Sequence, residues 1–214
     1  LQMPADGYTL CACTKSNIAK VVSTNRVSYL DDLHWAGLLI KDPECVITRR
    51  GGPIQNWEAL MADARKRTRP QIWLGPATGG QDHVFAMKTW AQFGIAADWV
   101  PFSSGNEALV ALLGDQGTAY VGNPRDAVGN PELQLVAVSS PRRLAQFPDA
   151  PTYAELGAPK LDNEYLWRGF ALKQGCPSTV LAWYDELFRR ITADKEWQSF
   201  WENEGMEVVY DSET

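Results

Sequence analysis

The chain has 214 residues, of which 45% are hydrophobic, and a formal net charge of −6 at pH 7. This length and apolar content are typical of a soluble globular protein with one domain or two small ones. The excess of acidic residues argues against a nucleic-acid-binding surface, and no apolar run approaches the roughly 18 residues that a membrane-spanning helix needs.

Four cysteines, Cys11, Cys13, Cys45 and Cys176, are accompanied by only two histidines, and no CxxC pair occurs. This pattern argues against a zinc site, and we expect neither a metal nor a cofactor. Cys11 and Cys13 face the same side of a predicted strand and cannot easily bridge one another. One long-range disulfide and a set of free thiols both remain open.

The first quarter of the chain predicts three strands. Asp6-Gly7 is a turn signal, and the first strand is expected over residues 8–13. A polar loop and a short helix to Val22 follow. Apolar runs then predict buried strands at 35–40 and 45–48, the second ending at a glycine turn.

The middle of the chain alternates helices and strands. Asn56 is a candidate N-cap for a helix that ends in a basic cluster, which we interpret as the solvated end of that helix. Strands are predicted at 72–74, 98–101, 118–121 and 133–138. Helices are predicted up to Gly94, up to Gly114 behind the capping stretch Ser103-Ser104-Gly105-Asn106, and after the capping box Thr152-x-x-Glu155.

The last quarter predicts a strand at 166–172, a helix capped by Ser178, a helix at 195–204 and a strand at 207–210. Strands that alternate with helices in this way favour an α/β fold with mostly parallel sheets.

Residues 71–87 are the segment on which the functional prediction depends most. A short buried strand leads through a glycine-rich loop into a helix, an arrangement that turns free backbone N–H groups and the helix dipole toward an anion. The loop is neither a Walker A motif nor GxGxxG, so a nucleotide site has no support. A plain turn between strand and helix, whose glycines only relieve steric strain, is the alternative.

The order of motifs resembles the periplasmic solute-binding proteins of tripartite tricarboxylate transporters, the TctC or Bug family. Its motifs DGYTL, GSAGxGSxxH, VPY, AVTSAKR, PDVPT and WxGL…GTP find counterparts at residues 6–10, 75–83, 100–102, 137–143, 148–152 and 167–177. The glycine-rich loop is one residue shorter here. The series runs in order across nearly all 214 residues.

The resemblance implies a two-lobed periplasmic binding protein type 2 fold, each lobe a mostly parallel sheet flanked by helices. The first lobe would combine residues 1–45 and 164–214, and the second would span 46–163. Family chains carry an additional strand, helix and strand at their start, so we expect the first lobe to be truncated. The resemblance implies the periplasm, although residues 1–4 show no signal-peptide pattern.

In the family, carboxylates are held largely by backbone amides and waters from two opposing loops. Carried onto the second lobe, this implies ligand contacts from Thr78, Gly79, Gly80, Gln81, Asp82 and His83. Ser104 and Gly105, at a predicted helix N-terminus, could add donors, and Asn123, after a predicted strand, could line the cleft. Asp82 could instead be the N-cap of the following helix, or accept the ammonium group of an amino-acid ligand. His83 could simply satisfy the surface between the lobes.

The first lobe would contribute Thr14, Ser16 and Asn17, which follow the end of a strand, where open α/β sheets place their ligands. An ordinary polar turn is the alternative. Arg168 could grip a carboxylate through its planar guanidinium, or could pin the crossing strands together.

The expected function is capture of a small organic acid (a mono-, di- or tricarboxylate, an aromatic acid or an acidic amino acid) and its delivery to membrane transporter subunits. A signalling receptor of the same fold is an alternative. An enzyme is disfavoured because no cysteine lies in an activated setting beside His83 and no paired carboxylates appear. We expect a monomer that binds no nucleic acid.

Overall fold

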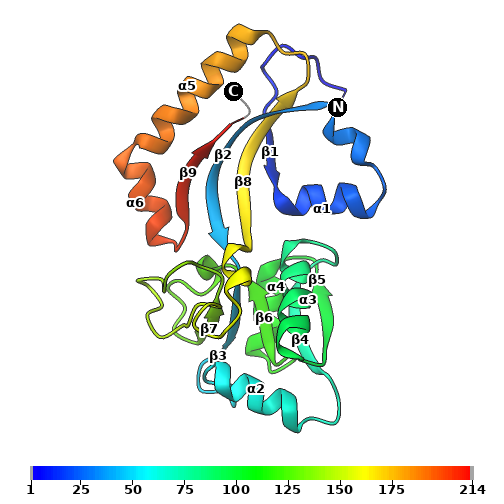
Figure 1. The fold of residues 1–214 in the computed structure, drawn as a ribbon, viewed down its shortest axis with the longest axis vertical. Coiled ribbons are helices and arrows are strands. Elements are labelled where there is room, and N and C mark those ends of the chain that lie inside the picture. The colour runs from blue at the N-terminus through cyan, green and yellow to red at the C-terminus, as the bar shows by residue number, and fades with distance from the viewer. Residues whose placement is uncertain (1, 213–214) are drawn as a thin grey trace. The chain divides into compact units, whose positions relative to one another are not determined.

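The computed structural model describes residues 2–212, and these divide into two compact units. The first unit combines Leu1–Asp42 with Leu166–Thr214, and the second is Pro43–Tyr165 (Figure 1). The chain therefore leaves the first unit after Asp42 and re-enters it at Leu166. That these units act as the two lobes of a binding protein stays a prediction.

The first unit is a four-stranded sheet in the order β1-β8-β2-β9. Its elements are β1 (Cys11–Thr14), α1 (Lys15–Ser23), η1 (Val27–Leu30), β2 (Leu33–Pro43), β8 (Tyr165–Lys173), α5 (Ser178–Ala193), α6 (Lys195–Asn203) and β9 (Glu207–Asp211). β1 pairs antiparallel with β8, and β2 pairs antiparallel with β9. Figure 1 shows α5 and α6 following one another along the same side of this sheet.

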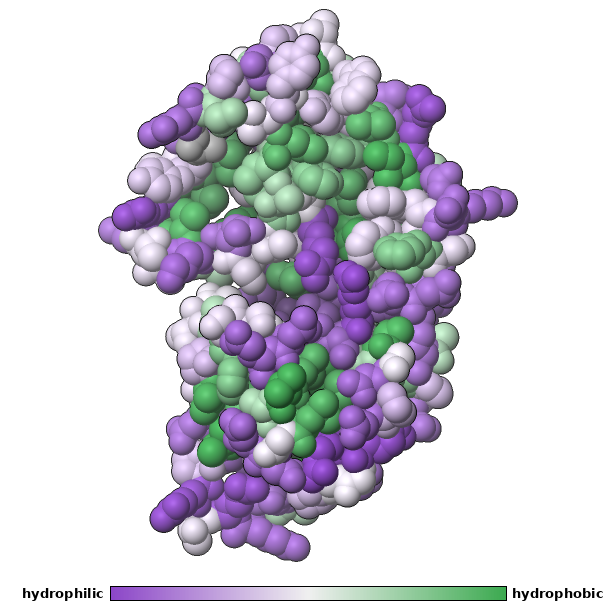
Figure 2. Space-filling model, turned by 180° about the vertical axis from the view of Figure 1, so that it is seen from behind, coloured by the Kyte–Doolittle hydropathy of each residue, from purple (hydrophilic) through white to green (hydrophobic). Residues whose placement is uncertain are grey.

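The core of the first unit is small. Its buried members are Ala36, Leu39, Ile40, Leu172, Phe188 and Met206. Phe188 of α5 stacks on Phe170 of β8 with ring centroids 5.5 Å apart, which ties the helix to the sheet. Figure 2 shows apolar side chains gathered on the surface of this unit, in the upper half of the view. Tyr8, at 93% exposure, is the most exposed large hydrophobic residue among those that the structure describes in this unit.

The second unit holds a five-stranded sheet in the order β5-β4-β6-β3-β7. Its elements are β3 (Cys45–Arg49), α2 (Trp57–Lys66), β4 (Gln71–Pro76), α3 (Gln81–Phe93), β5 (Ala97–Phe102), α4 (Gly105–Leu113), β6 (Ala119–Gly122), η2 (Pro124–Asp126), β7 (Leu133–Val138) and η3 (Pro159–Asn163). β4 lies parallel to both β5 and β6, whereas β3 lies antiparallel to both β6 and β7.

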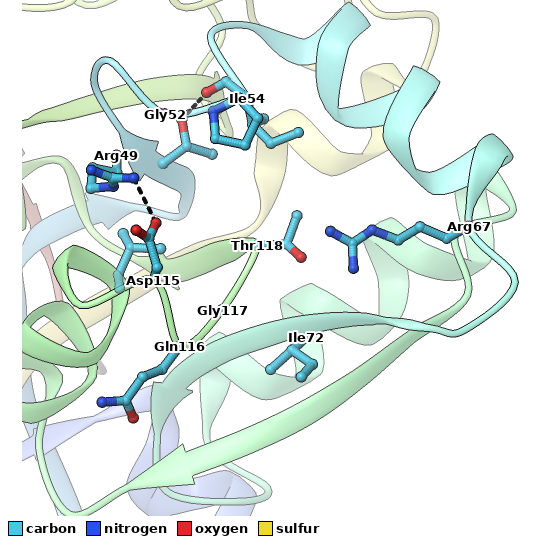
Figure 3. A pocket seen from close by; sticks show the side chains of 12 residues that line it. Arg49, Gly52, Ile54, Arg67, Ile72, Asp115, Gln116, Gly117 and Thr118 are labelled. Atoms are coloured by element: carbon cyan, nitrogen blue, oxygen red, sulfur yellow. Dashed lines mark hydrogen bonds and ion pairs between the residues drawn. The ribbon is translucent and has the colours of Figure 1, made fainter.

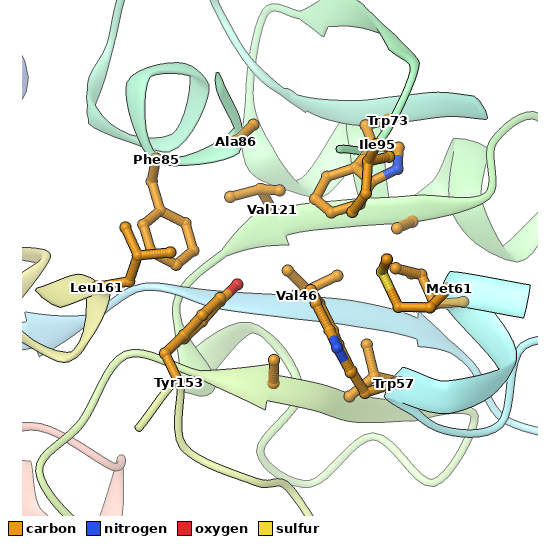
Figure 4. Packing of buried hydrophobic residues seen from close by; sticks show 14 of the residues in the cluster. Val46, Trp57, Met61, Trp73, Phe85, Ala86, Ile95, Val121, Tyr153 and Leu161 are labelled. Atoms are coloured by element: carbon orange, nitrogen blue, oxygen red, sulfur yellow. The ribbon is translucent and has the colours of Figure 1, made fainter. Parts of the chain in front are cut away.

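Two apolar clusters cover the two faces of this sheet. One cluster joins α2 and α3 to the sheet through residues such as Trp57, Phe85 and the fully buried Trp73 and Tyr153 (Figure 4). The other joins α4 to the opposite face through Leu112 and its neighbours. The second unit is therefore a three-layer α/β/α arrangement, held together mainly by burial of large apolar side chains.

The expectation of mostly parallel sheets is wrong. Two of the three pairings in the first sheet are antiparallel, and so are two of the four in the second. Alternating strands and helices predict that elements pack in layers, but the direction of a strand depends on which strands it joins across the sheet.

Three local expectations also need correction. The first strand is not 8–13 but only Cys11–Thr14. Ser178 does not cap α5, because the N-cap is Pro177 and Ser178 is the first helical residue. Thr152 and Glu155 do exchange the reciprocal hydrogen bonds of a capping box, at 2.8 and 3.3 Å, yet a turn follows rather than a helix.

All four cysteines are free thiols, so the long-range disulfide is not formed. The Sγ atoms of Cys13 and Cys11 lie 3.6 Å apart, and burial together with Cys11 raises the pKa of the Cys13 thiol to about 12. Within residues 2–212, no helix combines the length and apolar character that crossing a membrane requires.

Candidate ligand-binding site

The predicted ligand residues fall into two groups, each at one end of the sheet of its own unit. In the second unit, parallel strands β4, β5 and β6 end side by side, and the segments that follow them carry Thr78, Ser104 and Asn123. In the first unit, Thr14 at the end of β1 lies opposite Arg168 of β8 in the strand register. Carboxyl ends of parallel strands are where open α/β sheets place ligands.

The loop between β4 and α3 is a tight turn that Trp99 holds in place. Ala77 and Gly79 have φ angles of 50° and 81°, the left-handed region that glycine adopts without strain. The indole Nε1 of Trp99 donates to the carbonyl oxygen of Ala77 at 2.7 Å. A Cβ at Gly75 would lie 2.2 Å from the Trp99 ring, so only glycine at position 75 lets this indole reach the loop.

His83 closes the same loop from the first turn of α3. Its Nδ1 accepts a hydrogen bond from the backbone N–H of Gly79 at 3.1 Å, and its ring lies on Trp99 with centroids 4.9 Å apart. Burial lowers the pKa of His83 below its ordinary value of 6.5. The imidazole is therefore neutral at pH 7, with its proton on Nε2, where it can donate to a ligand oxygen.

Gln81 and Asp82 are buried, at 2% and 8% exposure, in the first turn of α3. The Gln81 amide donates to Glu164 Oε2 at 3.3 Å, and Glu164 also forms an ion pair with Lys88. Asp82 is not the helix cap, because Gly80 occupies the N-cap position. A glycine cap brings no side chain of its own to the first N–H groups of α3.

Ser104 and Gly105 begin α4 after β5. The Ser104 hydroxyl accepts from the backbone N–H of Glu107 at 3.3 Å, so within the predicted capping stretch 103–106 the N-cap is Ser104. A Cβ at Gly105 would lie 2.8 Å from the hydroxyl of Tyr120. Position 105 therefore has to be small for a packing reason, whatever it does toward a ligand.

Asn123 follows β6 and is 8% exposed. Its amide Nδ2 donates to the carbonyl oxygen of Pro43 at 2.9 Å, and its backbone N–H donates to Asp126 Oδ2 at 3.0 Å. The same carboxylate accepts from the Tyr120 hydroxyl at 2.8 Å. Burial, and secondarily Asp126, raises the pKa of Tyr120, which keeps this phenol protonated as a donor.

In the first unit, Thr14 and Asn17 form the cap of α1. Asn17 Oδ1 accepts from both the backbone N–H and the hydroxyl of Thr14, at 2.7 and 3.0 Å. The half-buried Ser16 lies in the first turn of the same helix. Local capping thus uses part of the hydrogen-bonding capacity that was predicted for a ligand.

Arg168 is engaged by a buried carboxylate in its own unit. Asp42, at 0% exposure, accepts from Arg168 Nη2 at 2.6 Å and from Nε at 3.2 Å. The partly exposed guanidinium therefore compensates a carboxylate that has been removed from water.

The arrangement in the second unit suits an uncharged grip on an anion. The N-termini of α3 and α4 lie at one edge of the sheet. The neutral imidazole of His83 lies in the first turn of α3, and the exposed hydroxyl of Thr78 lies in the loop before that helix. Among residues 2–212, no group of three or more His, Cys, Asp or Glu side chains is placed to hold a metal ion. Such a site can bind and orient an anion through peptide N–H groups.

Sequence reasoning missed two residues that shape this edge, Trp99 and Tyr120. Both act across the sheet, on a loop and a helix far from them in sequence. An indicator was available in Gly75 and Gly105, since glycines at such positions often mark a close approach by another group.

A family model described as the tripartite tricarboxylate transporter family receptor, TctC, matches residues 2–214. Protein BugT of Bordetella pertussis is 27% identical over 163 residues, which cover 73% of this chain and 50% of BugT. The chain spans about half the length of the curated relatives it matches.

Solved structures show the same fold. MatC (Rpa3494) from Rhodopseudomonas palustris, with bound malate, superimposes with a TM-score of 0.82 at 19% identity and covers 96% of this chain and 72% of its own. R. palustris Rpa4515 with adipate gives 0.86 at 18% identity, covering 99% and 72%. These likenesses confirm the predicted α/β fold of a solute-binding protein, with mixed rather than parallel sheets.

The matched family is one of transporter receptors and not of enzymes. Its description agrees with the resemblance that the ordered motifs indicated, and its match runs through both units of the structure. The chain therefore belongs to the TctC family of tripartite tricarboxylate transporter receptors.

Proposed function

We propose that this chain is an extracytoplasmic solute-binding protein that captures a small organic carboxylate and delivers it to a membrane transporter of the tripartite tricarboxylate type. The observation that carries the proposal is the family match over residues 2–214. The loop of Gly79, which leads into the N-terminus of α3, supplies a physical means of holding a carboxylate.

The proposed ligand is a small organic acid such as a dicarboxylate. MatC carries malate and Rpa4515 carries adipate, and both share this fold. In the second unit, the donors proposed for the carboxylate are the first N–H groups of α3, the Thr78 hydroxyl and His83 Nε2. Peptide N–H groups recognise a carboxylate oxygen but not the remainder of the molecule, so they accommodate several acids.

The proposed capture requires contacts from both units, with the cap of α1 as the contribution of the first. Closure would follow from ligand contacts that are made only in the closed state. The proposed location is the periplasm, as the resemblance to this family implies, and the proposed partners are the membrane subunits of the transporter.

The test is a thermal-shift titration of the 214-residue chain against mono-, di- and tricarboxylates, aromatic acids and acidic amino acids. A ligand at 100 times its Kd stabilises the folded state by about 2.7 kcal/mol, which corresponds to several degrees. We expect at least one carboxylate to produce this shift and to be recovered unchanged by mass spectrometry. Absence of any shift across the panel, or conversion of the ligand to a product, contradicts the proposal.

A further inference from the structure

A cavity lies in the second unit, at the sheet edge opposite the candidate ligand-binding site. It has a volume of about 230 Å³ and is lined at the start of β4 by Ile72, before β6 by Thr118, and at the end of β3 by Arg49. Because β4 and β6 are parallel, their amino ends share this edge, whereas the Gly79 loop lies at their carboxyl ends.

Arg67 extends its guanidinium into this cavity toward Thr118 (Figure 3). It directly follows α2, and its Nε donates to Asp63 Oδ2 at 2.5 Å. Among the described residues, no hydrogen-bond partner is recorded for its two Nη groups. Its side chain is 41% exposed, as expected for the solvated helix end that the sequence predicts, so the cavity is open to solvent on this side.

Arg49 contributes a second guanidinium, held in place by Asp115. Its Nη2 donates to Asp115 Oδ1 at 2.6 Å, whereas its Nε is buried with no hydrogen-bond partner within residues 2–212. Asp115 adopts a φ of 59°, a left-handed conformation that Asp tolerates better than most residues with a Cβ. Its carboxylate orients Arg49 through the hydrogen bond to Nη2.

Thr118 places a hydroxyl on the wall between these arginines. Its backbone N–H donates to the carbonyl oxygen of Ile72 at 2.7 Å, which fixes the position of the residue. A Cβ at Gly117 would lie 2.5 Å from Leu74, so the glycine lets the chain pack closely just before Thr118. Within the described chain no partner is recorded for the Thr118 hydroxyl, which can donate to a ligand.

The lining carries two arginines and Asp115, and each arginine has one carboxylate partner, Asp115 for Arg49 and Asp63 for Arg67. Both guanidinium groups keep further N–H donors that these carboxylates do not use. Planar guanidinium groups pair in bidentate fashion with phosphate and carboxylate oxygens. We propose that this cavity is a second anion site, separate from the candidate ligand-binding site, which binds a small phosphate or carboxylate oxyanion through Arg67, Arg49 and Thr118.

The test is an NMR titration of the ¹⁵N-labelled chain with inorganic phosphate and, separately, with succinate, with chloride balancing the ionic strength. Binding shifts the backbone amides of Gly117 and Thr118. Arg67→Gln and Thr118→Val each weaken it by about tenfold or more, because each removes a donor to a charged group. Asp63 keeps the amide of Gln71 as a donor at 2.8 Å, so Arg67→Gln leaves no acceptor unpaired there.

The matched control is Arg65→Gln, which removes the same charge from α2 at a residue that does not line the cavity. It should bind the oxyanion as the parent chain does. A response to phosphate alone, to succinate alone or to both supports the site and shows which oxyanion it prefers. The proposal is overturned if neither anion shifts these amides at millimolar concentration, or if Arg65→Gln weakens binding as much as Arg67→Gln.

Discussion

The backbone N–H of Gly79 donates a hydrogen bond to Nδ1 of His83 at 3.1 Å, which makes the histidine a part of the loop that precedes its own helix. The bond consumes one of the loop N–H groups that sequence reasoning assigned to a ligand. In exchange, it fixes the neutral tautomer with a proton on Nε2. The hydrogen bond between the loop and the imidazole therefore depends on the protonation state of His83, and so on pH.

His83 should make stability depend on pH. Its pKa is lowered in the folded state, so the unfolded chain takes up the proton first as the pH falls. The stabilisation is complete above pH 6.5 and declines below it, until the lower folded-state pKa is passed. His83→Phe, which keeps an aromatic ring beside Trp99, should remove this decline and cost about 1 kcal/mol through the lost hydrogen bond. Urea unfolding at pH 5 to 8 measures both effects.

The same urea series on His34→Gln is the control, because it removes the other histidine of the chain and leaves the Gly79 bond intact. That variant should keep the decline below pH 6.5. If the decline survives in His83→Phe and disappears in His34→Gln, the pH dependence does not come from the loop.

Substitutions at Gly79 and at a matched glycine should distinguish a loss of stability through backbone strain from a loss of ligand affinity. Its φ of 81° strains any β-branched residue, although a Cβ there would meet nothing within 4 Å. Gly129 has a φ of 74° and equally open space, but it lies in the turn before β7. Both Gly79→Val and Gly129→Val should lose about 1–2 kcal/mol of stability. Only Gly79→Val should weaken carboxylate binding by about tenfold or more in calorimetry. Equal affinities in the two variants remove this loop from the ligand site.

Local sequence pattern predicted much of the fold, because whether a segment forms a helix or a strand depends largely on residues that are close together in the chain. The apolar run at 133–138 coincides with β7, and α3 ends at Phe93, just before Gly94, whose φ of 65° is the left-handed C-cap conformation that glycine adopts easily. The first strand was misplaced because alternation alone cannot show that Tyr8 stays in solvent. Strand direction was missed because β3 pairs with strands more than 70 residues distant.

The candidate site was predictable only in outline. The glycine-rich loop and the Ser104 cap follow from short sequence patterns. The grip of Trp99 on Ala77 does not, since the two residues are 22 apart and meet only after β4 and β5 pair. Likewise, the residues near Arg168 in the sequence do not indicate that Asp42, 126 residues away, is its partner.

The pair of Arg168 and Asp42 should be the most costly ion pair to break. Arg168→Gln removes the guanidinium that pairs with the fully buried Asp42, which we expect to cost about 2 kcal/mol or more. Adding Asp42→Asn should recover part of that loss, because the buried position 42 then carries no charge. Chemical denaturation of the two single variants and the double variant measures the coupling.

An exposed pair provides the comparison. Arg143 and Glu155 lie 3.0 Å apart, with side chains 44% and 45% exposed. Arg143→Gln should cost below about 1 kcal/mol, because solvent already screens this pair. If Arg168→Gln proves no more destabilising than Arg143→Gln, then burial does not decide the strength of the Asp42 pair.

The contact between Gly105 and Tyr120 should make the effects of substitutions at these two positions on the free energy of unfolding strongly non-additive. Gly105→Ala places a Cβ 2.8 Å from the Tyr120 hydroxyl but 3.9 Å from the ring carbon that bears it. The substitution alone should cost about 1–3 kcal/mol through overpacking. Tyr120→Phe alone should cost about 1 kcal/mol, since the buried hydroxyl donates to Asp126. In the double variant the clash is gone, so the loss should fall about 1 kcal/mol or more short of the sum.

Gly114→Ala, at the other end of α4, is the matched control for this cycle. A Cβ there would meet nothing closer than 3.4 Å, so the variant should be close to neutral in both the parent and the Tyr120→Phe background. Additive losses for Gly105→Ala and Tyr120→Phe would mean that the helix start moves away from the phenol at little cost. In that event a packing reason no longer accounts for glycine at position 105, and its N–H at the start of α4 becomes the stronger explanation.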